Sequence, residues 1–121
     1  MKEVRVILSK KAEEVYKRLN SEAETSKQSK MMLKAVNDKV GLIKANIHYG
    51  NPIAKNLIPE RYKIEYEIKN LFRVELPAFW RMLYTLKSEN EIEIIAFVID
   101  IINHQNMIKN LDTKEDKLFI L

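Results

Sequence analysis

Cysteine is missing from this chain of 121 residues, and glycine is nearly missing, with Gly41 and Gly50 as its two examples. Without cysteine there are no disulfides, no thiolate nucleophile and no cysteine-ligated zinc or iron–sulfur site. Two isolated glycines form no phosphate-cradling loop, which argues against nucleotide-dependent enzymes of the usual kinds. The longest apolar run, Ile94–Ile99, is far shorter than a membrane span, and no signal peptide is recognised. We therefore expect a cytoplasmic protein with no membrane partner.

The length and the charge point to one domain with an anionic partner. A chain of 121 residues holds one hydrophobic core. Lysine and arginine total 21 against 17 acidic residues, which gives a net charge of +4. This moderate excess favours an anionic partner. We expect a single domain over 1–121, with an insertion or connecting segment at 46–70 and a tail at 109–121. For the tail, pairing in a homodimer, docking on the sheet and disorder all stay open.

The strongest pattern predicts a β-hairpin over 71–86, with its turn at 77–79. With Ala78 at the centre of the turn, one face carries only apolar pairs: Leu76 with Trp80, Val74 with Met82, and Phe72 with Tyr84. The same register sets Glu75 opposite Arg81 and Arg73 opposite Leu83 on the other face. One placement of the turn thus satisfies both strands.

The remaining elements complete an α+β prediction. A third strand is expected at 91–100, where an almost continuous apolar run is typical of a central strand. The amino-terminal half predicts a strand at 4–8, a helix capped by Ser9, a polar turn at 20–24 and a second helix at about 26–45. In the connecting segment, alternation at 62–68 fits an added edge strand or an irregular segment with its tyrosines packed inward. We predict a small antiparallel sheet packed on an N-terminal helical hairpin.

The order β-α-α-β-β-β and the run Trp80-Arg81-Met82-Leu83-Tyr84 resemble the RelE/ParE superfamily of toxins from toxin–antitoxin pairs, most closely the RelE-like ribonucleases. That family has an aromatic-Arg-aliphatic-aliphatic-Tyr strand and a basic residue on the preceding strand, matched here by Arg73. Some members end the last strand with a catalytic histidine, at the place of His104. The resemblance covers roughly residues 1–108. It implies a metal-independent endoribonuclease without a cofactor, which cleaves mRNA at the ribosome, inhibits translation and is neutralised by a small antitoxin protein.

The chemistry of metal-free RNA cleavage suggests roles for four residues. A 2′-OH attacks the adjacent phosphate, so the site needs a base, an acid for the leaving 5′-oxygen, and cations on the phosphorane. Arginine suits the last task because its planar fork donates two hydrogen bonds and keeps its charge. Arg81 is the first candidate and Arg73 the second, with a Glu75–Arg81 surface ion pair worth ~0–1 kcal/mol as the structural alternative.

Proton transfer would fall to His104 and Glu75. A histidine titrates near neutral pH, although an exposed histidine with no task is the alternative for His104. Glu75 is a candidate general base, but the neighbouring arginines would depress its basicity. His48 lies in a loop without a partner at suitable spacing, and we interpret it as structural.

Lysines offer a second, less specific signal. Lys30 and Lys34 on the second helix and Lys55 in the connecting segment are candidate RNA-binding residues. For the helix lysines we favour an ordinary solvated outer face over RNA binding, because surface helices normally carry such charges.

The chain departs from the family at one position of consequence. Many RelE-like members place a tyrosine three or four residues past the histidine, where this chain has Met107 and Ile108. Tyr84 is expected to face the core, and Tyr49, Tyr62 or Tyr66 would have to enter from the connecting segment. The active site is therefore incomplete by the family pattern. Two alternatives stay open beside the ribonuclease: a ParE-like poison of DNA gyrase, and a non-catalytic member that binds RNA or a partner protein.

Overall fold

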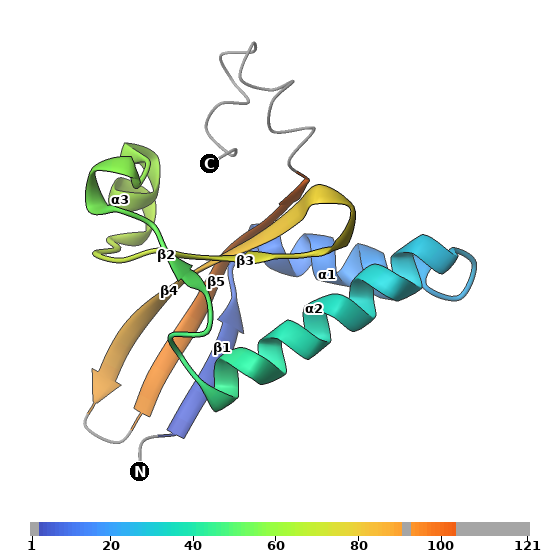
Figure 1. Ribbon diagram of the computed structural model, residues 1–121, viewed down its shortest axis with the longest axis horizontal. Coiled ribbons are helices and arrows are strands. Elements are labelled where there is room, and N and C mark those ends of the chain that lie inside the picture. The colour runs from blue at the N-terminus through green and yellow to red at the C-terminus, as the bar shows by residue number, and fades with distance from the viewer. Residues whose placement is uncertain (1–2, 91–92, 104–121) are drawn as a thin grey trace.

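The computed structural model describes the backbone of residues 3–90 and 93–103, with side chains for 4–87 and Ile101. Its centre is a five-stranded sheet in the order β1-β5-β4-β3-β2, with helices on both faces (Figure 1). The strands are β1 (Glu3–Leu8), β2 (Asn51–Pro52), β3 (Phe72–Glu75), β4 (Trp80–Asn90) and β5 (Glu93–Asn103). The protein is thus of the predicted α+β class.

The predicted helical hairpin is formed by α1 (Lys10–Glu22) and α2 (Lys27–Ala45). Each helix begins at a serine whose hydroxyl accepts a backbone N–H three residues on, at 3.1 Å for Ser9 and 3.2 Å for Ser26. The polar turn predicted at 20–24 is displaced, because α1 continues to Glu22. The Asn20 side chain donates to the Tyr16 carbonyl at 2.9 Å, so this polar side chain bonds within the helix instead of ending it.

The β3–β4 hairpin has the predicted register. Phe72 pairs with Tyr84, Val74 with Met82, Arg73 with Leu83, and Glu75 with Arg81. The Leu76 N–H donates to the Trp80 carbonyl at 2.8 Å, which closes the ladder at the turn. The apolar face packs on the helical hairpin, as expected. This core contains Ala12 and Leu19 of α1, Met32, Val36 and Ile43 of α2, Phe72, Val74 and Leu76, Met82 and Tyr84, and Ile101.

The prediction of an antiparallel sheet holds for β3, β4 and β5 but is wrong for β1. Strand β1 pairs parallel with β5, with Val4 opposite Ile94 and Leu8 opposite Val98. A parallel pair needs a long connection, and nearly the whole chain lies between these two strands. Strand β5 therefore has a neighbour on each side, which accounts for its almost continuous apolar run.

The connecting segment 46–70 is more structured than expected. It contains β2, a 3-10 turn η1 (Lys55–Leu57) and a helix α3 (Glu60–Tyr66). Helix α3 replaces both the edge strand and the irregular segment considered for 62–68. Tyr62 and Tyr66 are one helical turn apart, and Tyr62 is buried in a second cluster with Ile58, Ile68, Leu71 and Leu83. Because Leu83 alternates with Met82 and Tyr84, this cluster lies on the sheet face opposite α1 and α2. None of the helices in 3–90 is long and apolar enough to cross a membrane.

Candidate anion-binding site

Two neighbouring strands hold Arg73 and Arg81 on the sheet face turned away from α1 and α2. Arg73 lies between two buried residues of β3, and Arg81 precedes the buried Met82 in β4. Side chains alternate along a strand, so both arginines point to the side opposite the helical hairpin. Arg73 also pairs across the ladder with Asn51 of β2, and Arg81 pairs with Ile102 of β5. The arginines thus rest on adjacent strands inside the sheet.

One carboxylate lies between the two guanidinium groups. The Arg73 Nε is 3.1 Å from Oε1 of Glu75, and the Arg81 Nε is 3.4 Å from Oε2. The predicted cross-strand ion pair is therefore present, with Arg73 as an additional partner. The side chains of Arg73, Arg81 and Glu75 are 39%, 24% and 54% exposed, respectively. Ion pairs of such exposure are worth ~0–1 kcal/mol, so a better-matched anion can displace this carboxylate.

The arginines keep unused hydrogen-bonding capacity. Both Nε atoms are buried, and within the described side chains neither makes an aligned hydrogen bond, although each is close to Glu75. Each contact with Glu75 is made through Nε, and a guanidinium carries further N–H donors in the same planar fork. A tetrahedral oxyanion offers more oxygens in more directions. The arrangement is therefore chemically suited to bind a phosphate group.

The other predicted site residues are not gathered here. Lys30 and Lys34 are exposed on α2, on the helical side of the sheet, and Lys34 forms an ion pair with Asp38 at 3.0 Å. Lys55 is exposed in η1, shortly after β2. His104 lies outside the described residues, as do Met107, Ile108 and the tail. Asn103, where β5 ends, pairs with Trp80.

Tyr84 serves the scaffold, as predicted. Its ring is buried and stacked on Phe72, with centroids 5.1 Å apart. Its hydroxyl donates to the Ile47 carbonyl at 2.8 Å and accepts the Gly50 N–H at 2.9 Å. Burial raises the pKa of Tyr84 above its usual value. Tyr84 therefore ties the loop after α2 to the sheet and takes no part in the arginine site.

The connecting-segment tyrosines do not complete the site either. Both Tyr62 and Tyr66 belong to α3; Tyr62 is buried in the second cluster, and Tyr66 is partly buried against it. Tyr49 is partly exposed, and its hydroxyl accepts a hydrogen bond from Lys39 of α2 at 3.0 Å. His48 is exposed, and its ring lies 5.8 Å from that of Phe72, which faces the helices. None of these four side chains joins the arginine pair.

The structure adds an aromatic residue, Phe79, which sequence reasoning treated only as part of a turn. The Trp80 N–H donates to the Pro77 carbonyl, so Ala78 and Phe79 are the central residues of a tight turn. Both have positive φ, 56° and 65°, as a type I′ turn requires. Phe79 is 64% exposed. The available signal was a turn with Ala-Phe where such turns favour Asn-Gly.

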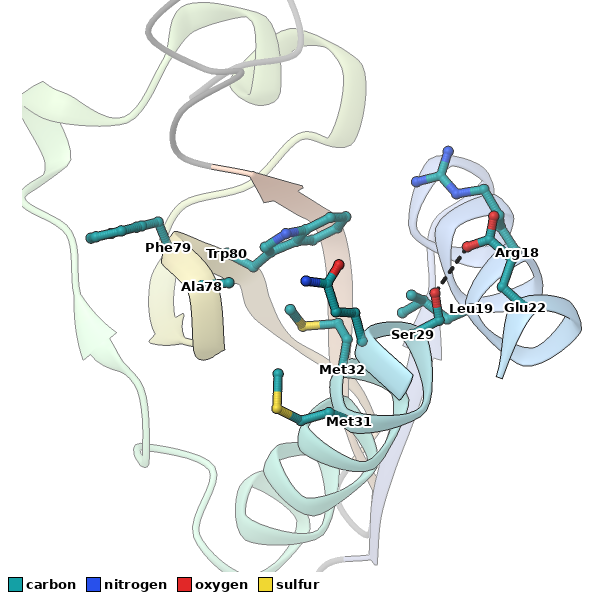
Figure 2. Close-up of a pocket in the computed structure, with 10 residues that line it drawn as sticks. Arg18, Leu19, Glu22, Ser29, Met31, Met32, Ala78, Phe79 and Trp80 are labelled. Atoms are coloured by element: carbon teal, nitrogen blue, oxygen red, sulfur yellow. Dashed lines mark hydrogen bonds between the residues drawn. The ribbon is translucent and has the colours of Figure 1, made fainter. Parts of the chain in front are cut away.

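A hollow of about 480 Å³ lies between this turn and the start of α2. Figure 2 shows Trp80, Met31 and Met32 around it, with Arg18 and Glu22 at the α1 side. Phe79 also borders this hollow, but Figure 2 shows its ring directed away from Trp80 and from α1 and α2. The side chains of Phe79 and Trp80 thus point to opposite sides of the hairpin.

No protein-family model matches this chain, and no curated protein matches it significantly.

Proposed function

We propose that this protein is a RelE-like toxin, a metal-independent endoribonuclease that cleaves mRNA and is neutralised by an antitoxin. The observation that carries the proposal is the arginine pair: Arg73 and Arg81 lie 3.1 and 3.4 Å from the two oxygens of Glu75, on the sheet face opposite α1 and α2. The order of the elements also supports it, because a strand, a helical hairpin and three antiparallel strands follow one another with only the 46–70 segment added. Its action would take place in the cytoplasm, on ribosome-associated mRNA.

In the proposed mechanism the scissile phosphate displaces the Glu75 carboxylate. Arg81 is the less exposed of the two arginines and would bind the phosphorane oxygens, with Arg73 beside it. Once displaced, Glu75 stays within reach of the 2′-OH and is the candidate base. His104 is the candidate acid, because it follows Asn103, whose ladder partner Trp80 is the neighbour of Arg81.

The test is inducible expression in a heterologous host, followed by growth measurement and primer extension on mRNA. Wild-type protein should produce ribosome-dependent cuts. Arg81→Ala should reduce cleavage by ~10²–10³, as for removal of one oxyanion-hole donor. His104→Ala should reduce it by ~10²–10⁴ and flatten the pH–rate profile, as expected for loss of a proton donor.

The matched control is Arg18→Ala, because Arg18 is exposed on α1 at the helical side of the sheet. This variant should remain toxic, and all three variants should melt close to wild type. A large fall in the melting temperature of Arg81→Ala would mean that the ion pair with Glu75 is structural. If Arg81→Ala and His104→Ala stay fully toxic, the ribonuclease proposal fails. DNA damage without mRNA cuts would then favour a gyrase poison, and harmless expression would favour a non-catalytic binding protein.

A further inference from the structure

Phe79 is held in an unfavourable backbone conformation without contributing to the core. Its φ of 65° lies in the left-handed region, which bulky side chains rarely adopt. Its side chain is 64% exposed, so burial does not compensate for this conformation. Glycine at this position, with asparagine before it, would form the same turn without strain. Residues kept in such conformations cluster at functional sites.

The ring lies on the same side of the hairpin as the arginine pair. Figure 2 shows it directed away from α1 and α2, opposite to the Trp80 ring. Arg81, two residues further along the chain, also points away from the helices because it alternates with the buried Met82. The exposed Phe79 ring and the Arg81 side chain therefore both lie away from α1 and α2, and Arg73 is joined to Arg81 through Glu75.

We propose that Phe79 is a stacking platform for an unpaired nucleobase of RNA whose phosphate is bound by Arg73 and Arg81. The inference rests on the proposed function and assigns to it a base-binding residue. A nucleotide combines a flat π-face with a phosphate, which matches an exposed aromatic ring and two guanidinium groups on one side of the hairpin. Single-stranded RNA is recognised chiefly through such stacking, because its bases are free of a duplex. The hairpin tip thus supplies the aromatic face that Met107 and Ile108 do not offer.

Binding is measured with purified protein and a short single-stranded 2′-O-methyl oligonucleotide that contains 2-aminopurine. This probe has no free 2′-OH, so it resists the proposed cleavage, and its fluorescence changes when the base stacks. Phe79→Leu keeps an apolar side chain without a π-face and should weaken binding about 5- to 150-fold, equivalent to ~1–3 kcal/mol. Phe79→Tyr should restore binding and the fluorescence change. Tyr49→Leu is the control, because Tyr49 is a partly exposed aromatic residue hydrogen-bonded to α2.

Salt dependence separates stacking from phosphate binding. Phe79→Leu should leave the slope of log K against log salt unchanged, since no charge is lost. Arg81→Ala should reduce the slope by ~0.7, the value for one phosphate contact on a single strand. The double substitution Ala78→Asn/Phe79→Gly should raise the melting temperature and still weaken binding, a combination that a purely structural turn residue would not produce.

Two results would overturn the inference. One is equal binding by wild type, Phe79→Leu and Phe79→Tyr. The other is a Phe79→Leu variant that binds RNA normally but loses a protein partner, because Phe79 would then insert into a protein pocket. If Arg81→Ala abolishes mRNA cleavage while the Phe79 variants cleave and bind as wild type does, the stacking proposal is wrong and the ribonuclease proposal is supported. If RNA binding depends on Phe79 but no mRNA cleavage is found, the stacking proposal is supported and the ribonuclease proposal is wrong.

Discussion

Gly50 occupies a site where a single methyl group should destabilise the protein. Its N–H donates to the Tyr84 hydroxyl at 2.9 Å. A Cβ at this position would lie 2.8 Å from Tyr84 Cε1 and 3.1 Å from the Phe72 Cβ. Both neighbours are buried and stacked on each other in the core between sheet and helices. Neither can retreat without disturbing that packing, so Gly50→Ala must displace the loop.

Two effects set the size of the loss. Forcing a methyl group into a well-packed core costs ~1–3 kcal/mol. A displaced loop also weakens the hydrogen bonds that the Tyr84 hydroxyl makes with Gly50 and Ile47, at ~0.5–1.5 kcal/mol each. We therefore expect Gly50→Ala to lower the free energy of unfolding by about 2–4 kcal/mol. At ~4–8 °C per kcal/mol for a small domain, the melting temperature should fall by roughly 8 °C or more.

Gly41→Ala is the matched control with the opposite sign. Gly41 is exposed within α2, and its Cβ would meet nothing within 4 Å. Alanine there should raise stability by ~0.5–1 kcal/mol through its better helix propensity. Both variants are measured by urea unfolding followed by circular dichroism. An unchanged denaturation midpoint for Gly50→Ala would refute the close contact with Tyr84. If both alanine variants were more stable than wild type, the inference that Gly50 is sterically restricted and Gly41 is not would be wrong.

Three further substitutions test other contacts. Glu75→Gln should strengthen oligonucleotide binding about fivefold, since a carboxylate ~4 Å from a phosphate in water costs ~1 kcal/mol; unchanged affinity would show that the carboxylate does not compete. Tyr84→Phe keeps the ring but leaves two loop backbone groups unpaired, so it should cost ~1–3 kcal/mol at neutral pH. Burial raises the pKa of Tyr84 in the folded protein. The stability that wild type has over Tyr84→Phe should therefore be complete below the pKa of the unfolded chain, near ~10, and be lost as the pH rises through the pKa of the folded protein. Urea titrations across that pH range measure this loss. Asn70→Ala should cost ~1–3 kcal/mol, because the Asn70 Oδ1 accepts from the Leu86 N–H at 2.8 Å and the Thr85 hydroxyl at 2.9 Å; an unaltered midpoint would refute this.

The hairpin shows what can be predicted from the residues alone. A shift of one residue would reverse the faces of both strands, so the apolar pairs and the turn allow one register. That register places Arg73, Glu75 and Arg81 together on the face away from the core, and the structure pairs Glu75 with Arg81 and Arg73 with Leu83 accordingly. The roles of these residues in catalysis stay predictions.

The segment 62–68 shows where the same approach failed. Its alternation of apolar and charged residues satisfies a strand, yet Tyr62 and Tyr66 also stand at helical spacing, and the helix forms. Periodicity in so short a stretch cannot separate the two. The deciding factor is Leu83, which offers Tyr62 an apolar surface on the second face of the sheet. That surface exists only after β3 and β4 have paired.

Local features of this protein follow from residues that are near one another in the chain. The serine caps act over three residues, and the β3–β4 register depends on one turn, so short-range sterics and hydrogen bonding suffice to specify them. Other features depend on which distant surfaces meet. These are the parallel pairing of β1 with β5 and the Tyr84–Gly50 contact. The stabilising free energy of these contacts comes from packing between segments that are far apart in the sequence. A local sequence pattern does not determine which distant segment a given surface will contact.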